Sequence, residues 1–372
     1  MKSLTIGGAT IDTIAIIASD RIERMSMLNA DSSFLLLQEG SKTEATEVST
    51  HTGGGAVNSA VGMARLGLDV STLVKLGKDA RADTVLARLL SEGISTRWAV
   101  RDGRAPTGAS VMVSSHDRNA AVFTFRGANT LLESSDLKDE AFAVDLVHVA
   151  SLSNESAERF PEIIGKAKAA GALVTANPGP RQLAARGHAF EACLGNIDIL
   201  AINRSEAEVM LPSLIARFGE GGPKIAGSDL PRLAERGLSG GGFRMTLLAF
   251  MAAIHSMGPR YLLLTDGMEG AYLGSTDKLM FCPALDVQVA GTAGAGDAFT
   301  STFATFIALG SSPDHALRAA TVNAASVVSY IDTQTGLLPR DEIEQQVSAR
   351  LNEMPIRHWS LAAQPTQRTA VG

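Results

Sequence analysis

An aspartate follows a glycine-rich turn in the last third of the chain, at Gly294-Ala295-Gly296-Asp297. Apolar residues at helical spacing resume directly after it, so the turn is expected to open a helix. The free N–H groups and the macrodipole of a helix N-terminus favour a bound anion, and glycine lets a phosphate approach the backbone closely. A carboxylate beside that anion has a chemical role if Asp297 accepts a proton from an attacking hydroxyl during phosphoryl transfer. The alternative is a plain turn in which Asp297 only caps the helix.

A second glycine run, Gly53-Gly54-Gly55, opens another expected helix that carries Asn58 in its first turn. A small ligand can approach glycine backbone closely, and the Asn58 amide can both donate and accept hydrogen bonds. Asp12 follows the first expected strand, where open α/β sheets place ligand-binding groups. The alternatives are a flexible hinge for the glycines and a turn cap for Asp12.

Strands and helices alternate along much of the chain, which predicts a parallel, doubly wound sheet. The residues at 285–289 alternate in polarity and are expected to form a strand that feeds the Asp297 helix. Two runs around residues 116–119 predict a hairpin. The other expected strands are 4–8, 69–76, 144–150, 172–177 and 197–203, and the expected helices include 83–92, 157–171 and 313–330.

Composition narrows the class of partner. The 372 residues carry a formal charge of −6, and no Lys/Arg cluster marks a surface for nucleic acid or an anionic membrane. Two cysteines, Cys193 and Cys282, cannot form a disulfide framework, and the histidines lack metal-ligand spacing. The apolar stretch at 245–254 is too short to span a bilayer. We therefore expect a soluble, cytoplasmic protein that acts on a small molecule.

The segment Gly291-Thr292-Ala293-Gly294-Ala295-Gly296-Asp297 resembles the nucleotide-site signature of the ribokinase-like (PfkB) family of carbohydrate and nucleoside kinases. The run from Gly53 to Asn58 resembles the sugar-binding signature of that family. The resemblance extends over roughly residues 4–336, with the motifs in family order. It implies an α/β fold, a ribokinase-like three-layer α/β/α sandwich with a mostly parallel sheet and a small β lid.

The same resemblance implies a domain organisation. One kinase domain would occupy residues 1–350, with the lid formed by about 13–50 and 106–127. A C-terminal tail at 351–372 is expected to be partly disordered. The lid is a candidate surface for a homodimer.

The resemblance also implies a role for each motif residue. Asp297 is the base, with an anion hole at Gly294, Ala295 and Gly296, and ATP and Mg²⁺ are the implied cofactors. The implied acceptor-binding residues are Asp12, Gly53, Gly54 and Asn58; the implied nucleotide-binding residues are Asn203, Thr265, Gly267, Gly270 and Asn323; and the implied metal ligand is Glu206. Two alternatives stay open, because Asn203 and Glu206 also fit a capping box and residues 265–270 also fit a hairpin turn.

The function implied is transfer of the γ-phosphate of ATP to a hydroxyl of a sugar or nucleoside. A rival is a non-catalytic sugar or nucleotide sensor on the same fold, which would need neither Asp297 nor Glu206. A dinucleotide-dependent oxidoreductase would require a GxGxxG run after the first strand, and that run is absent from the sequence.

Several positions depart from the family pattern. Gly291 stands where relatives commonly have an Asp that helps to bind a potassium-like ion, so activation by monovalent cations is in question. Lys78 and Ala82 replace a usual acid and a usual glycine, so that segment is given no role beyond packing, and Thr175 replaces a usual Asp, so no charge is assigned there. The segment 211–257 is longer than expected and is interpreted as an insertion on the outside or at an oligomer contact. The sequence does not distinguish ribose, hexose and adenosine as acceptors.

Overall fold

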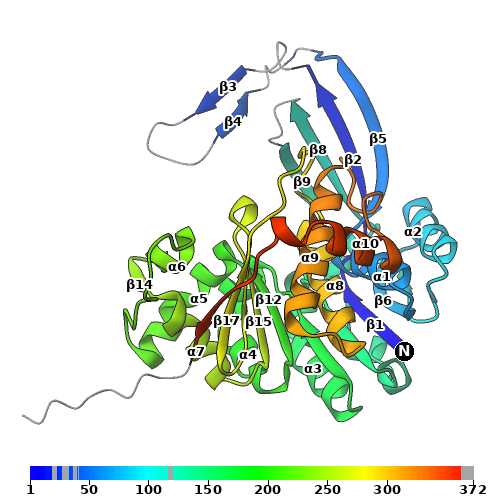
Figure 1. Cartoon of the computed structure of the whole chain (residues 1–372). Coiled ribbons are helices and arrows are strands. Elements are labelled where there is room, and N and C mark those ends of the chain that lie inside the picture. Colours follow the sequence, from blue (N-terminus) through cyan, green and yellow to red (C-terminus); the bar gives the residue numbers. More distant parts are fainter. Residues whose placement is uncertain (19–22, 27–32, 37–39, 41, 116–119, 362–372) are drawn as a thin grey trace, which may run out of the picture.

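The computed structural model describes residues 1–18, 23–26, 33–36, 40, 42–115 and 120–361. Its main feature is a ten-stranded sheet with the order β18-β17-β16-β15-β12-β11-β10-β1-β6-β7 (Figure 1). In chain order its strands are β1 (Lys2–Gly7), β6 (Asp69–Gly77), β7 (Val100–Asp102), β10 (Leu146–Val149), β11 (Leu173–Ala176), β12 (Ile199–Asn203), β15 (Tyr261–Thr265), β16 (Ala271–Gly274), β17 (Lys278–Cys282) and β18 (Arg357–Ser360).

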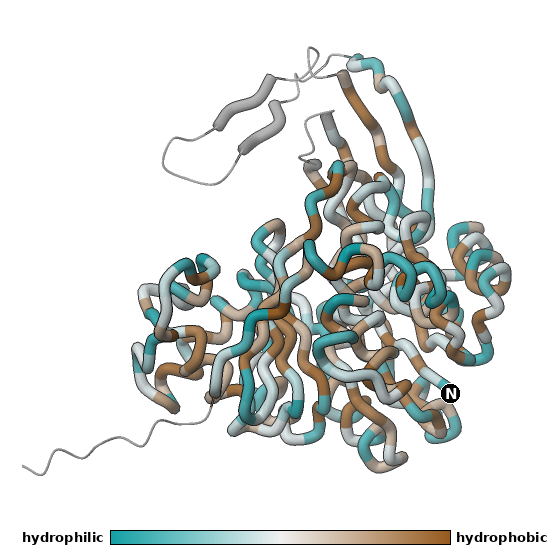
Figure 2. The backbone as a smooth tube through the Cα atoms, in the orientation of Figure 1, coloured by the Kyte–Doolittle hydropathy of each residue, from teal (hydrophilic) through white to brown (hydrophobic). Residues whose placement is uncertain are grey.

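The strands from β7 to β15 are all parallel to one another, and β16, β17 and β18 extend one edge in antiparallel fashion. Crossover helices cover both faces of such a sheet, so its strands are apolar on both sides. Figure 2 shows the strands at the centre of the main body as hydrophobic. The mostly parallel sheet expected from the sequence is confirmed.

Two apolar clusters lie on the two faces of the sheet. Within β15, Leu262 and Leu264 belong to one cluster and Tyr261 and Leu263 to the other, because successive strand residues point to opposite faces. Helices α3, α4, α5 and α7 contribute to the first cluster, and α1, α2, α8, α9 and α10 contribute to the second. The three-layer α/β/α sandwich is therefore confirmed. The helices are α1 (Gly55–Arg65), α2 (Ala80–Ser91), α3 (Phe160–Ala169), α4 (Pro180–Glu191), α5 (Arg204–Phe218), α6 (Arg232–Arg236), α7 (Leu247–Ser256), α8 (Ala295–Ala308), α9 (Pro313–Val328) and α10 (Arg340–Ala349).

A four-stranded sheet with the order β5-β2-β8-β9 projects from the main body (Figure 1). Its strands are β2 (Thr10–Ile17), β5 (Ala45–Gly53), β8 (Gly108–Ser115) and β9 (Ala120–Phe125), and a separate hairpin joins β3 (Glu23–Ser26) to β4 (Ser33–Leu36). These strands coincide with most of the segments expected to form the lid. Within the expected lid, residues 19–22, 27–32, 37–39, 41 and 116–119 lie outside the described part of the chain.

The structure corrects two expectations. Residues 283–293 form an irregular connection and not a strand over 285–289, and the N–H groups of Ala290 and Gly291 donate to the carbonyl oxygen of Val328 in α9 instead of to a strand. The main domain also continues beyond residue 350, since β18 pairs with β17. Residues 362–372 lie outside the described chain.

The long segment at 211–257 forms the end of α5, helix α6, a hairpin of β13 (Leu238–Gly240) and β14 (Phe243–Met245), and α7. It packs beside α5 at one side of the main body (Figure 1). No helix of the described residues is long and apolar enough to cross a membrane.

Candidate active site

The glycine corner between β5 and α1 brings two carboxylates close to the same stretch of backbone. A Cβ built on Gly53 would lie 1.9 Å from Oδ2 of Asp12, and one built on Gly55 would lie 3.3 Å from Oδ1 of Asp297. Gly54 has a φ of 95°, and a Cβ there would lie 2.5 Å from the carbonyl oxygen of Gly8. The structure therefore brings the two aspartates to either side of this corner.

Asp12 lies within β2 and does not cap a turn. The Ser110 hydroxyl on the neighbouring strand β8 donates a hydrogen bond to Oδ1 of Asp12 at 2.6 Å. Burial raises the pKa of Asp12, and the bonds from Ser110 and Thr10 oppose that rise. Directly paired strand residues share a face, so Asp12 and Ser110 present polar atoms on one side of the small sheet.

Asp297 lies in the first turn of α8, shortly after a glycine whose backbone has the left-handed conformation. Gly294 is the N-cap, with φ 79°, and a Cβ there would lie 2.7 Å from Cβ of Thr333. A Cβ built on Gly296 would have no neighbour within 4 Å, so its backbone is open to a ligand. The turn thus leaves free N–H groups of α8 next to the carboxylate.

Asn58 holds the Asp297 carboxylate in place. Its Nδ2 donates to Oδ2 of Asp297 at 2.8 Å. Its Oδ1 accepts from the Thr333 hydroxyl at 2.8 Å and from Nε2 of Gln334 at 3.2 Å, which fixes the amide with its NH₂ group toward Asp297. Gln334 also donates to the carbonyl oxygen of Thr52 at 3.0 Å.

Thr333 and Gln334 belong to this site, although no sequence motif points to them. They follow α9 in an irregular loop and lie more than 270 positions from Asn58 along the chain. Only the polar composition of the segment Asp332-Thr333-Gln334-Thr335 sets it apart, and that composition also suits an ordinary turn.

The capping box proposed as an alternative for Asn203 and Glu206 is present. Oδ1 of Asn203 accepts from the Glu206 N–H at 2.9 Å, and Oε2 of Glu206 accepts from the Asn203 N–H at 2.8 Å. Glu206 is nevertheless buried, and burial raises its pKa to about 7, with a further contribution from the negative charge of Asp297. Burial likewise raises the pKa of Asp297, against the bond from Asn58.

A buried carboxylate whose pKa is raised further by a second negative charge, as Glu206 is by Asp297, suits a site that receives a cation. Glu206 and the Asn203 side chain supply oxygen atoms, which Mg²⁺ prefers, and Mg²⁺ usually keeps several waters and binds substrate phosphates. Within the described residues no cluster of three or more His, Cys, Asp or Glu side chains could hold a metal. The oxygen atoms of Glu206 and Asn203 fit a magnesium ion whose other ligands are waters and phosphate oxygens.

A cavity of about 490 Å³ adjoins the N-terminus of α8. Its lining includes four of the residues expected at the nucleotide, Asn203, Thr265, Gly267 and Gly270, together with Gly296. Its remaining walls are largely apolar and include Leu285, Val287, Val289, Phe299, Ala325 and Val328. Apolar walls suit a base, and glycine backbone with a helix N-terminus suits phosphates, so the cavity fits ATP. The hairpin turn between β15 and β16 is also present. Residues 265–270 therefore form a hairpin turn, and three of them, Thr265, Gly267 and Gly270, also line the cavity.

Asn323 does not reach this cavity, contrary to expectation. Its side chain is fully buried, donates to the Thr302 hydroxyl at 2.8 Å and accepts from the Leu338 N–H at 2.9 Å. Thr321 and Ala324 from the same helix line the cavity instead. The sequence identified the right helix, but the helix presents neighbouring residues to the pocket.

Residues 22–340 match the family described as pfkB family carbohydrate kinase. The deoxyribokinase of Salmonella typhi is 26% identical over 343 residues, which cover 91% of this chain and 99% of that protein. The structure of Arabidopsis thaliana ribokinase complexed with ribose and ATP superimposes with a TM-score of 0.65 at 21% identity, covering 92% of this chain and 97% of that one. Burkholderia thailandensis nucleoside kinase in complex with inosine gives a TM-score of 0.69 at 19% identity, with 95% and 100% covered.

Proposed function

Since this chain belongs to the pfkB family of carbohydrate kinases, and is a phosphotransferase with an alcohol group as acceptor, we propose that it transfers the γ-phosphate of ATP to a pentose hydroxyl. The observation that carries the proposal is the Asp297 carboxylate, bound by Asn58 at the open N-terminus of α8, between the glycine corner and the cavity. The names of the deoxyribokinase and ribokinase relatives support a pentose as acceptor.

Asp297 would accept the proton of the attacking hydroxyl. Asn58 keeps Oδ2 of Asp297 hydrogen-bonded, which leaves Oδ1, the atom nearest Gly55, to face an acceptor at the glycine corner. The raised pKa of Asp297 makes it a stronger base than an ordinary aspartate. The amides of Ala295, Gly296 and Asp297 would donate to oxygens of the transferring phosphoryl group.

Residues on both sides of the glycine corner would bind the acceptor. Asp12, already oriented by Ser110, can accept hydrogen bonds from sugar hydroxyls, and the backbone of Gly53 and Gly54 lets the ring approach closely. Glu206 and Asn203 would hold Mg²⁺, which supplies charge neutralisation at the phosphates.

The small sheet would close over the acceptor as a lid. Its face opposite Asp12 carries the exposed apolar side chains Val48, Val111, Phe123 and Phe125, which the strand register places together. We propose that this face pairs with the same face of a second copy, since a contiguous apolar patch favours association. Phe123→Ser should convert a dimer to a monomer in analytical ultracentrifugation, and a monomeric parent protein would contradict the proposal.

The decisive experiment measures ADP release from Mg-ATP with ribose, deoxyribose, fructose, other hexoses, adenosine and inosine. Turnover on a pentose, with kcat/KM well above that of the nucleosides, is the expected outcome. Preferential turnover of a nucleoside would overturn the pentose assignment. Binding of ATP without turnover of any acceptor would instead favour the sensor alternative.

A further inference from the structure

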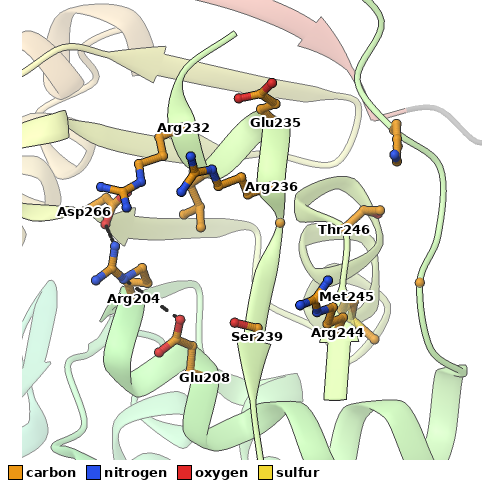
Figure 3. A pocket seen from close by; sticks show the side chains of 14 residues that line it. Arg204, Glu208, Arg232, Glu235, Arg236, Ser239, Arg244, Met245, Thr246 and Asp266 are labelled. Carbon is orange, nitrogen blue, oxygen red and sulfur yellow. Dashed lines mark ion pairs between the residues drawn. The ribbon is translucent and has the colours of Figure 1, made fainter. Parts of the chain in front are cut away.

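A second cavity, of about 610 Å³, lies beside α5 and is built largely by the long segment at 211–257 (Figure 3). Five basic and three acidic side chains line it, which makes its lining net positive. The basic residues are Arg204, Lys224, Arg232, Arg236 and Arg244, and the acidic residues are Glu208, Glu235 and Asp266.

Most of the positive charge is not neutralised by protein. Arg204 forms ion pairs with two of the acidic residues, to Oδ1 of Asp266 at 3.1 Å and to Glu208 at 3.9 Å (Figure 3). Within the described chain, the side chains of Arg236 and Arg244 form neither ion pairs nor hydrogen bonds. Arg232 lowers the pKa of Asp266 through its charge without forming an ion pair.

Two of these arginines are also held where they repel each other. Arg232 and Arg236 are four residues apart in α6, so they lie on the same side of the helix. Like charges at this spacing are destabilising, and an anion between them removes the penalty. Arg244 approaches from β14, opposite Ser239 of β13.

The walls that carry these arginines are fixed before any ligand binds. The buried hydroxyl of Tyr272 on β16 accepts a hydrogen bond from the Ala234 N–H at 3.3 Å, which ties α6 to the main sheet. Gly237 has φ 70°, and a Cβ there would lie 2.5 Å from the carbonyl oxygen of Met245, so α6 and the hairpin meet at backbone distance. The backbone that carries the arginines is therefore already in place, and binding has to order only their exposed side chains.

One residue that lines this cavity carries a buried acceptor atom without a donor. Asp266 is only 8% exposed, and its Oδ2 has no hydrogen-bond partner. An unsatisfied buried acceptor is costly, so a ligand hydroxyl that donates to it would be stabilised.

From this geometry we infer that the cavity binds a phosphate ester that carries free hydroxyl groups. The phosphate would lie among Arg232, Arg236 and Arg244, whose planar guanidinium groups match phosphate oxygens, and a hydroxyl would donate to Asp266. This site is separate from the nucleotide cavity and does not depend on the proposed acceptor.

The two cavities share stretches of chain. Asn203, Thr265 and Gly267 line the nucleotide cavity, whereas their neighbours Arg204 and Asp266 line the cationic one. A ligand that moves the Arg204–Asp266 ion pair therefore acts on residues directly bonded to the nucleotide site. Occupancy of the cationic cavity should change nucleotide affinity, and by linkage the nucleotide should change ester affinity by the same factor.

Isothermal titration calorimetry with ribose 5-phosphate tests the site while Mg²⁺ and a non-hydrolysable ATP analogue saturate the nucleotide cavity. Wild-type protein should bind the ester, and Arg236→Ala and Arg244→Ala should each weaken binding at least ~10-fold, which corresponds to about 1.4 kcal/mol. Inorganic phosphate should bind at least ~10-fold more weakly than the ester. Arg217→Ala is the matched control, because Arg217 is an exposed arginine of α5 outside the cavity.

Three results would overturn the inference. The first is that both arginine variants bind the ester as tightly as the wild-type protein does. The second is that the nucleotide analogue abolishes binding of the ester, and the third is that phosphate and the ester bind with equal affinity. Titration of the ATP analogue with and without saturating ester tests the coupling between the two cavities. An analogue affinity that the ester leaves unchanged would contradict this coupling.

Discussion

The proposed acceptor site and the cationic cavity differ in how far their polar side chains are hydrogen-bonded to the protein. Around Asp297, the amide of Asn58 and the side chains of Thr333 and Gln334 form a connected hydrogen-bond network. In the cationic cavity, Arg236 and Arg244 make no polar side-chain contact with the described residues. A satisfied network holds one geometry, whereas exposed arginines without protein partners stay free to bind an anion. The first region therefore supports the proposed orientation of Asp297, and the second supports the proposed binding of an anion.

The largest effect should come from Asp297→Asn. The amide keeps the size of the carboxylate and can still accept the bond from Asn58, but it cannot take a proton. We expect kcat to fall at least ~100-fold, the scale for a positioned general base, while ATP affinity in calorimetry stays within about 2-fold. Near-normal turnover would mean that the network orients a residue without a catalytic role.

Gln334→Ala should break the network itself. The change leaves Asn58 with one donor fewer and the buried carbonyl of Thr52 without its Gln334 donor. We expect the free energy of unfolding in urea to fall by about 1–3 kcal/mol, with a loss of kcat because Asn58 is no longer held. An unchanged unfolding free energy would show that water replaces the amide at no cost.

Glu206→Gln should change how stability depends on pH. Burial raises the pKa of Glu206 to about 7, so the folded protein retains a proton that the unfolded chain, with a pKa of about 4.3, has lost. This contribution is fully present below the unfolded pKa and is lost as the pH rises through 7. Without Mg²⁺, wild-type protein should lose roughly 1–2 kcal/mol more than the variant between pH 5 and pH 8.

Added Mg²⁺ should reverse that loss in the wild type at pH 8 and have little effect on the variant, because the ion binds the deprotonated carboxylate. Urea unfolding at several pH values, with and without Mg²⁺, provides the measurement. Equal pH slopes without Mg²⁺ would contradict the raised pKa of Glu206, and an equal effect of Mg²⁺ on the two proteins at pH 8 would remove Glu206 from the metal site.

Arg236→Ala should have a small effect on stability, in contrast to Gln334→Ala. No polar contact of the side chain is lost and its repulsion with Arg232 is removed, so we expect the unfolding free energy to change by less than ~0.5 kcal/mol, in the stabilising direction at low salt. A loss above about 1 kcal/mol would show that Arg236 has a structural role.

The smallest effect concerns monovalent cations. A Cβ on Gly291 would lie 3.3 Å from the carbonyl oxygen of Tyr330 and 3.4 Å from that of Ile331, but glycine supplies no carboxylate there. We expect K⁺ in place of a large organic cation to change kcat less than about 2-fold at constant ionic strength. Strong activation by K⁺ would show that backbone carbonyls alone bind the ion.

The sequence by itself determined the parallel α/β architecture and the local geometry of each motif. Asn203 and Glu206 form their capping box, and Gly54 and Gly294 adopt positive φ, because such features depend on backbone groups a few residues apart. Asn203, Thr265, Gly267 and Gly270 also line the cavity that was expected for them.

Only the tertiary structure decided which distant groups meet. It assigned Gln334 to Asn58, turned Asn323 away from the nucleotide cavity, left residues 283–293 without a strand partner and added β18 to the main sheet. It also gathered the arginines of the 211–257 segment around Asp266. These contacts join segments far apart in the chain, so they depend on packing between layers, for which spacing along the sequence carries no signal.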